Sequence, residues 1–370
     1  MNRVMVRTMS RTPSLKTVAR AVGVSVATVS NAYNKPEHLS AALRERIFAT
    51  ARELEYAGPD PAARSLRSGR TGAIGVLSTA QLSYAFTDPY CTVFLAGVAD
   101  VAEQHRTSVL LMPLAPRAGS DPEQVLASVE AVRNAVIDGV VIDGIDDGHP
   151  ALQVVTYRAL PCVRSSDDPA SRCVLIDDRA AAAAVGAHLA GFGHQDVAVI
   201  AGSAHEPGTI REVADDSMLY PYARRRLAGL RDGLGSAARV TVVAVGANRA
   251  EAGLAAARLM LRRRPRPTAI AATSDVLGLS ALAVLREHGL RSGVDVSVTG
   301  FDDIPAAAAA GLTTVRQPIR EKGRLMGRML LDPSLTERRL VLPVEFVARA
   351  STGPVPPVTA DAWREREHGS

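Results

Sequence analysis

Acidic and hydroxyl side chains stand directly after three short apolar runs of the chain. They are Asp143, the pair Ser274 and Asp275, and Asp302. An arginine, Arg226, opens a segment with helical periodicity. Carboxylates and an arginine that meet across a cleft each form paired hydrogen bonds to neighbouring hydroxyl groups. These residue types therefore indicate a site that holds a polyhydroxylated small molecule.

Three further candidates, Phe86, Asp88 and Tyr90, lie in the loop after the first apolar run of this region. They are able to stack on a ligand or to hydrogen-bond with it, and an aromatic-rich loop is equally compatible with a lid or a subunit contact. Two of the candidates also have a simpler interpretation. Asp275 could cap the following helix, and Asp143 could cap a loop.

Strands and helices that alternate along the chain must position these residues. The predicted strands, each a short apolar run, are 73–77, 109–113, 139–143, 174–177, 197–201, 240–245, 268–272 and 296–301. The helical segments between them include 94–103, 180–190, 250–261 and 276–288. This order predicts an α/β fold with parallel sheets covered by helices, and about 300 residues exceed one usual unit, so we expect two lobes. In such sheets ligands bind at the carboxyl ends of the strands.

The segment 15–34 predicts two short helices joined by a glycine turn. Val18 and Val22 give the first helix an apolar face, and Gly23 permits a left-handed turn. Ser25 caps the second helix, whose Val29 faces inward. The residues left outside are Val26, Ala27, Thr28, Ser30 and Asn31. This is the layout of a helix-turn-helix, which places its second helix in the major groove of DNA; the alternative is a helical hairpin inside some core.

The flanking sequence favours the DNA-binding interpretation. A third helix over 40–54 has apolar residues at helical spacing and closes a three-helix core, so we expect a DNA-binding domain over 15–58. Residues 1–70 contain 12 Lys and Arg against 5 Asp and Glu, a formal charge of +7, whereas the remaining residues carry 31 against 33. The basic excess therefore lies at the end of the chain that would neutralise phosphates.

Residues 59–71 form an expected hinge between this domain and the core. Asp60 is a good helix cap, Pro61 suits the first helical position, and the short helix that follows is too brief to be stable alone. On DNA, Leu66 would be an apolar wedge in the minor groove, with Arg64 and Arg67 near phosphates. The alternative is a basic linker whose leucine packs on the next domain.

Five stretches, in this order, carry a resemblance to a known family. They are Leu-Lys-Thr-Val-Ala-Arg-Ala-Val-Gly-Val-Ser-Val-Ala-Thr-Val-Ser from 15, Ala-Arg-Ser-Leu from 63, Gly-Ala-Ile-Gly-Val from 72, Gly-Phe-Asp-Asp-Ile-Pro from 300 and Leu-Thr-Thr-Val-Arg-Gln-Pro from 312. With them the sequence resembles the LacI/GalR (lactose-repressor) family of bacterial transcription regulators. The resemblance implies a periplasmic-binding-protein-like core over 72–353 that mediates dimerisation. In this core the chain crosses between two lobes three times and binds an effector in the cleft.

The resemblance also implies roles for individual residues. The positions of the second helix that read bases in this family are here Val26, Ala27 and Asn31, and many relatives carry arginine at the third. Asparagine pairs with adenine, whereas valine and alanine offer only apolar contact, for example to a thymine methyl. Contacts to phosphates, which position the helix without reading sequence, are assigned to Thr17, Ser25, Thr28 and Ser30.

For the effector, Asp302 and Arg226 match the positions that hold it in family members. Ser274 stands where some relatives have asparagine. The serine side chain is shorter, so it reaches less far toward the effector.

Catalytic function is not indicated by any motif. The chain has no phosphate-binding loop, no nucleophile elbow and no dinucleotide-binding turn, so we assign no catalytic residue and no cofactor. The eight histidines show no metal-ligand spacing, and we interpret His188 and His194 as surface or capping residues at a helix end.

A secreted sugar-binding protein is the stronger rival. It would need an export signal, which residues 1–14 do not supply, and no apolar run is long enough to span a membrane. The three cysteines are odd in number and far apart, as expected for free thiols in the cytoplasm. Residues 1–14, a basic tail, and 354–370 are expected to be disordered tails.

The sequence thus predicts a cytoplasmic, nucleoid-associated transcriptional regulator. One helix-turn-helix reads half a site, so we expect a homodimer on a palindromic double-stranded operator. The expected activity is repression controlled by a small effector, with a carbohydrate as the first candidate. The alternative is a two-lobed ligand-binding protein without specific DNA recognition.

Overall fold

The structure, a computed structural model, describes residues 13–59, 69–78, 82–115, 120–205 and 208–356. The chain divides into two compact units, Met1–Gly72 and Ala73–Ser370, which we treat separately. Arg64, Leu66 and Arg67 of the expected hinge lie outside the described residues, as does most of both predicted tails.

The first unit is a small helical domain. Its elements are α1 (Leu15–Val22), α2 (Val26–Asn34), the 3-10 helix η1 (Pro36–His38) and α3 (Ala41–Glu53). Ser25 caps α2 through the N–H of Thr28 at 3.0 Å, and Gly23 ends α1 with φ +78°. Val29 and Ile47 are fully buried in the shared core. The three predicted helices therefore form the predicted helix-turn-helix and its closing helix.

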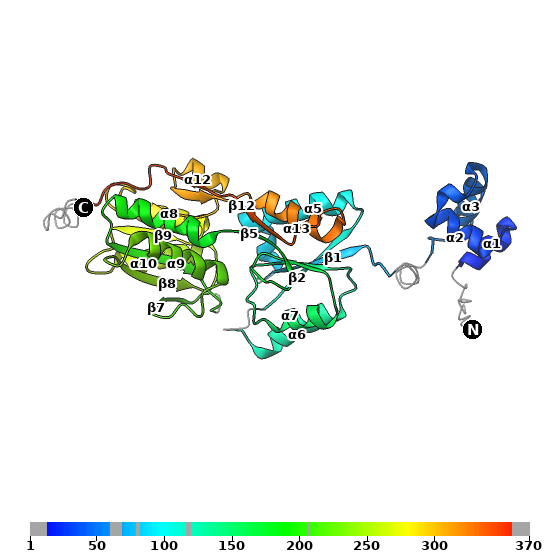
Figure 1. The fold of residues 1–370 in the computed structure, drawn as a ribbon, viewed down its shortest axis with the longest axis horizontal. Helices are drawn as coiled ribbons and strands as arrows, with labels where there is room; N and C mark the ends of the chain where they lie inside the picture. Colours follow the sequence, from blue (N-terminus) through cyan, green and yellow to red (C-terminus); the bar gives the residue numbers. More distant parts are fainter. Residues whose placement is uncertain (1–12, 60–68, 79–81, 116–119, 206–207, 357–370) are drawn as a thin grey trace, which may run out of the picture. The chain divides into compact units, whose positions relative to one another are not determined.

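The second unit begins with a lobe built on a parallel sheet of strand order β12-β5-β4-β3-β1-β2 (Figure 1). Its elements are β1 (Ala73–Ser78), η2 (Leu82–Phe86), α5 (Pro89–Gln104), β2 (Ser108–Pro113), α6 (Pro122–Asn134), β3 (Val140–Asp143), α7 (Pro150–Tyr157), β4 (Cys162–Arg164), β5 (Arg172–Ile176), α13 (Ile319–Leu331) and β12 (Arg339–Leu342). Helices α5 and α13 cover one face of the sheet, and α6 and α7 cover the other.

The second lobe has strand order β10-β9-β6-β8-β7, parallel except for β7. Its elements are α8 (Asp178–Gly191), β6 (Asp196–Gly202), β7 (Ile210–Val213), α9 (Pro221–Leu234), β8 (Arg239–Val245), α10 (Ala250–Leu261), β9 (Ala269–Ala272), α11 (Asp275–Glu287), β10 (Ser297–Thr299) and α12 (Pro305–Ala309), with the pair β11 (Thr314–Arg316) and β13 (Glu345–Val347).

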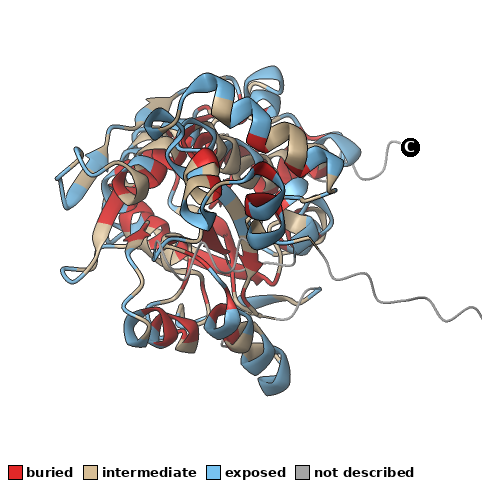
Figure 2. Cartoon of the chain, turned by 90° about the vertical axis from the view of Figure 1, so that its right-hand side faces the viewer, coloured by how far each residue is buried: buried red, intermediate tan, exposed pale blue. Residues whose placement is uncertain are grey.

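Alternate residues of each central strand of this sheet face opposite layers of helices. In β6, Val197 and Val199 pack toward α8 and α9, whereas Ala198 and Ile200 pack toward α10 and α11. Helices α8 and α9 approach closely because Gly229 has no side chain. A Cβ at this position would lie 2.0 Å from the carbonyl oxygen of Arg179. Figure 2 shows the same layering as buried strands beneath helices with exposed outer faces.

The chain passes between the lobes three times, as the resemblance implied: after β5, after β11 and after β12. All the predicted strands form. The strands that the sequence analysis missed include β7 and β12, which lie at sheet edges and contain only exposed and half-buried residues. The sequence of β7, Ile-Arg-Glu-Val, has polar residues at its centre and gives no continuous apolar run, as expected for a strand that is not buried on both faces.

The interpretation of His194 as a surface or capping residue is wrong, because its side chain is only 1% exposed. Its Nδ1 lies 2.9 Å from Thr268 Oγ1, and its Nε2 lies 2.9 Å from Ser297 Oγ and 3.0 Å from the carbonyl oxygen of Gly353. It thus holds the C-terminal segment against the second lobe, and the described chain continues along this lobe to residue 356.

Burial lowers the pKa of His194 below the ordinary value of 6.5. As the pH falls below 6.5, the unfolded chain therefore binds a proton that the folded chain excludes, and stability is lost on acidification. We expect His194→Gln, which cannot gain that proton, to show a smaller fall in urea midpoint between about pH 7 and pH 5. Equal falls in the variant and the wild type would show that His194 does not titrate on unfolding.

Candidate ligand pocket and nucleic-acid interface

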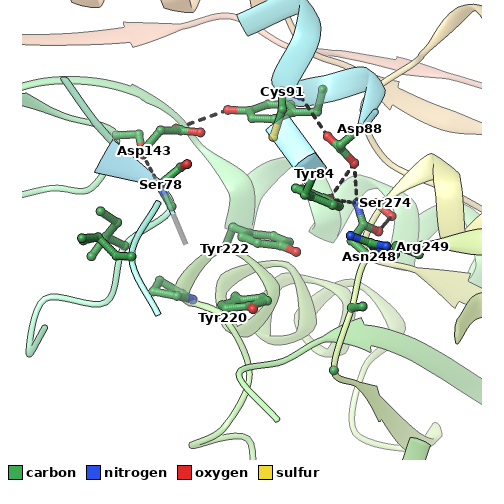
Figure 3. Close-up of a pocket in the computed structure, with 18 of the residues that line it drawn as sticks. Ser78, Tyr84, Asp88, Cys91, Asp143, Tyr220, Tyr222, Asn248, Arg249 and Ser274 are labelled. Carbon is green, nitrogen blue, oxygen red and sulfur yellow. Dashed lines mark hydrogen bonds between the residues drawn. The ribbon is translucent and has the colours of Figure 1, made fainter. Parts of the chain in front are cut away.

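A cavity of about 830 Å³ lies between the two lobes. It is bounded by residues at the carboxyl ends of the strands, among them Ser78 and Asp143 in the first lobe and Asn248 and Ser274 in the second (Figure 3). This is the edge at which parallel sheets bind ligands, and the volume is that of a small-molecule site.

Arg226, on α9, is the centre of a buried ionic cluster in the second lobe. Its Nε donates to Asp178 Oδ1 at 2.8 Å, and its Nη1 donates to the carbonyl oxygen of Thr273 at 2.6 Å. Nη1 also lies 3.6 Å from Asp302 Oδ1, and the guanidinium carbon lies 3.5 Å from the centre of the Phe301 ring. The predicted pair of Arg226 and Asp302 is therefore in contact.

Asp302 lies in the loop after β10, on unusual backbone. Its φ is +123°, a region that few residues other than glycine adopt, and its N–H donates to the carbonyl oxygen of Val315 at 2.8 Å. Gln317 Nε2 donates to Asp302 Oδ1 at 2.6 Å. Burial raises the pKa of Asp302 well above its usual range, while the charge of Arg226 opposes that rise. Strained backbone held by its surroundings is characteristic of binding sites.

A second cluster lies in the first lobe and includes a buried lysine. Lys322, on α13, donates from Nζ to Tyr90 Oη at 2.8 Å and to Asp143 Oδ1 at 3.1 Å. Tyr90 Oη also donates to Asp143 Oδ1 at 3.3 Å. Burial, and then the charge of Asp143, raise the pKa of the Tyr90 phenol. The lysine charge is thus already shared with a carboxylate at the cavity wall.

A third cluster connects the two lobes along one side of the cavity. Asn248 Nδ2 donates to Tyr84 Oη at 3.0 Å and to Asp88 Oδ2 at 3.2 Å, and Tyr84 Oη donates to Asp88 Oδ2 at 2.6 Å. Ser274 Oγ donates to Asn248 Oδ1. Dashed lines in Figure 3 trace this chain of contacts along one side of the pocket.

The structure brings six of the eight candidate effector residues to the cavity wall: Asp88, Tyr90, Asp143, Arg226, Ser274 and Asp302. Phe86 and Asp275 do not line it. The Phe86 side chain points to solvent, with 64% of its surface exposed. Asp275 is fully buried below the pocket, where its carboxylate accepts from Thr314 Oγ1 at 2.6 Å and from Ile304 N–H at 2.9 Å.

Other lining residues escaped the sequence analysis. Asn248 follows a predicted strand, but Gly246 and Ala247 stand between them. Lys322 lies in the apolar stripe of a helix, between Ile319 and Met326. A charged residue at such a buried position needs a partner, and this could have marked Lys322 as a candidate site residue.

The candidate nucleic-acid interface is the outer face of α2. Val26 is 40% exposed and Ala27 is exposed, while Asn31 is half-buried near the end of the helix. The side-chain amide of Asn31 makes no hydrogen bond with any residue that the structure describes, so it remains available to an external partner.

The hydroxyl groups assigned to phosphates take part in local contacts. Thr17 belongs to a capping box with Ser14, and Ser25 Oγ lies 2.8 Å from Thr28 Oγ1. Ser30 Oγ accepts from Asn34 Nδ2 at 3.2 Å. A hydroxyl group has further hydrogen-bonding capacity beyond one such contact.

Among residues 13–356, apart from the short gaps given above, no cluster of three or more His, Cys, Asp or Glu side chains could hold a metal ion. In the same part of the chain no helix is both long and apolar enough to cross a membrane.

A helix-turn-helix domain joined to a two-lobed α/β core with a ligand-sized cavity defines a class of protein, the ligand-responsive DNA-binding regulators. Residues 14–58 match the bacterial regulatory proteins of the lacI family, and residues 187–352 match the periplasmic binding protein-like domain. An HTH-type transcriptional regulator of Mycobacterium tuberculosis is 37% identical over 362 residues, which are 94% of this chain and 99% of the relative. The chain therefore belongs to the LacI family of bacterial transcription regulators, as its motifs predicted.

Two solved structures are similar over nearly their whole length. The Lac repressor dimer bound to operator and the anti-inducer ONPF is 26% identical, with a TM-score of 0.72 over 93% of this chain and 100% of that one. The complex of the transcriptional regulator CelR with cellobiose is 27% identical, with a TM-score of 0.62 over 92% and 99%.

Proposed function

We propose that this regulator is a repressor, acting as a homodimer on palindromic operator DNA in the cytoplasm, whose operator affinity is set by a neutral polyhydroxylated effector such as a sugar. The observation that carries the proposal is the cavity between the lobes, with its buried carboxylates and paired cations. The Lac repressor dimer on its operator and the CelR complex with cellobiose support it by similarity.

The hydrogen-bonding groups of the cavity favour hydroxyls as ligand groups. Asp143 and Asp302 each use Oδ1 in the contacts described, which leaves Oδ2 of both as acceptors. Lys322 and Arg226 retain N–H donors, because an ammonium group has three and a guanidinium group five. A hydroxyl group both donates and accepts, so a polyol matches this mixture.

The same contacts disfavour an anionic ligand group beside Arg226 and Lys322. The two buried cations, Arg226 and Lys322, are already neutralised by Asp178, Asp302 and Asp143. Beside these two cations, a carboxylate or phosphate on the ligand would meet the acidic groups at low dielectric. Arg249, which also lines the cavity, has no ion pair with a described residue.

The cavity supports binding rather than catalysis. Cys91 lines it, but burial, and then the charge of Asp88, raise the pKa of its thiol. A thiol in such surroundings is a poor nucleophile.

Operator selection tests this function directly. The purified full-length protein is used to select random duplex DNA at fixed salt, with and without matched sugars that are neutral, carboxylated or phosphorylated. We expect enrichment of a palindrome whose recovery changes with a neutral sugar and not with its acidic analogues. Failure to enrich any sequence, with or without sugar, would overturn the DNA-binding part, and a preference for an acidic analogue would overturn the effector class.

A single substitution tests the base-reading role of Asn31. We expect Asn31→Ala to relax the base preference at one position of each half-site, because an amide that pairs with one base discriminates by about 1–3 kcal/mol. Ser30→Ala serves as the control, since the loss of a phosphate contact weakens binding to all sequences equally. The same selection measures both. A uniform loss in Asn31→Ala would mean that this residue only positions the helix.

A further inference from the structure

The cluster of Tyr84, Asp88, Asn248 and Ser274 joins the two lobes. Tyr84 lies on η2 and Asp88 caps α5 in the first lobe, whereas Asn248 follows β8 and Ser274 caps α11 in the second. Asn248 is the link between them. Its Nδ2 donates to both residues of the first lobe, and its Oδ1 accepts from Ser274.

The polar atoms of this cluster are largely occupied by one another. Asp88 Oδ2 accepts from Tyr84 and Asn248, and its Oδ1 accepts from the N–H of Cys91 at 2.9 Å. Asp88 and Ser274 are buried, with only 4% and 3% of their surface exposed. Burial, and then the nearby Asp88 charge, raise the pKa of Tyr84, which keeps the phenol protonated as a donor. Hydrogen bonds to a buried carboxylate are stronger than those between neutral groups.

We propose that Asn248 is a positioning residue that latches the lobes together across the pocket when no effector is bound. Asp88 and Ser274, expected from the sequence to hold the effector, serve this latch. The effector then binds to a cleft whose lobes are already joined, through the Asp302 and Asp143 side of the cavity. The latch therefore sets how often the cleft opens for entry and release of the effector.

The test uses hydrogen–deuterium exchange of the full-length protein without effector or DNA. Asn248→Asp keeps the shape of the side chain but places a second carboxylate against Asp88. We expect exchange about tenfold faster in peptides over 84–92 and 274–278, which carry the two ends of the latch, because a charge-assisted bond is replaced by repulsion. Peptides over 197–201, in the core strand β6, should exchange at the wild-type rate, which separates opening from unfolding.

The charge-swapped double variant provides the rescue. Asp88→Asn combined with Asn248→Asp restores one amide and one carboxylate at the contact, and asparagine remains a good cap for α5. We expect it to return exchange in both peptides to within about twofold of the wild type.

Paired tyrosine variants provide a second control. Tyr84→Phe removes a latch hydroxyl and should also speed exchange. Tyr220→Phe removes from the same cavity a hydroxyl that has no hydrogen bond to any described residue, and should not. Unchanged exchange in Asn248→Asp, or no rescue in the swapped variant, would overturn the latch. Neither result depends on the identity of the effector or the operator.

Discussion

Replacing Asp302 with alanine is expected to abolish the response to effector while operator binding without effector persists. The carboxylate lines the cavity, its Oδ1 is held by Gln317, and its Oδ2 remains for the ligand. Loss of charge-assisted hydrogen bonds from a buried carboxylate costs about 3 kcal/mol, or roughly 100-fold in effector affinity. The fold should survive, because Arg226 keeps its contact with Asp178. Operator affinity across an effector titration measures the response.

Two controls separate ligand binding from general damage. Asp302→Asn keeps the oxygen that accepts from Gln317, and should lose only part of the affinity. Asp232→Ala removes an exposed carboxylate of α9 that pairs with Arg179, and should leave the titration unchanged. A wild-type dose response in Asp302→Ala would remove this residue from the effector site.

The helical domain was predictable because its signals are local. Ser25 and Ser40 cap the helices that follow them, and Gly23 takes the left-handed turn. Each of these features depends on residues within one helical turn, so the sequence pattern determines the element without knowledge of the rest of the chain.

The core was predictable only where strands are buried on both faces. β6 and β8 are largely apolar and buried, whereas every residue of β12 at the sheet edge is exposed or half-buried. β12 also joins its sheet beside β5, far away in the sequence. Such pairings depend on the path of the whole chain, and this path was available from the family resemblance rather than from periodicity.

The candidate site also contains residues that the local sequence predicts and residues that depend on the path of the whole chain. The rule that ligands bind where strands end found Asp143 and Asp302, because Asp143 is the last residue of β3 and Asp302 comes directly after the predicted strand 296–301. It did not find Lys322, which reaches the cavity from α13 after the chain has returned to the first lobe. It wrongly included Asp275, since position after a strand does not tell whether a side chain turns toward the cavity or into the core.

Replacing Arg226 with alanine is expected to destabilise the core by about 3–5 kcal/mol, the usual cost of breaking a buried ion pair. Arg226 is 8% exposed and contacts two carboxylates that are themselves buried, Asp178 and Asp302. Burial alone would lower the pKa of the guanidinium, but these two charges raise it above its ordinary value, so the pairing outweighs the desolvation. Without the arginine, Asp302 would retain only the neutral Gln317 among the side chains that contact it here.

The neighbouring residue offers a matched control for this prediction. Arg225 also contacts Asp178, at 3.2 Å, but its side chain is 42% exposed, so Arg225→Ala should cost less than about 1 kcal/mol. Arg226→Lys should fall between the two, because an ammonium keeps the charge but not the planar fork that reaches Asp178 and the Thr273 carbonyl together. Urea unfolding with a common slope measures all three variants. If Arg226→Ala and Arg225→Ala unfolded at the same urea concentration, burial would not be what makes the Arg226 pair stabilising, and the cluster would be a feature of ligand binding alone.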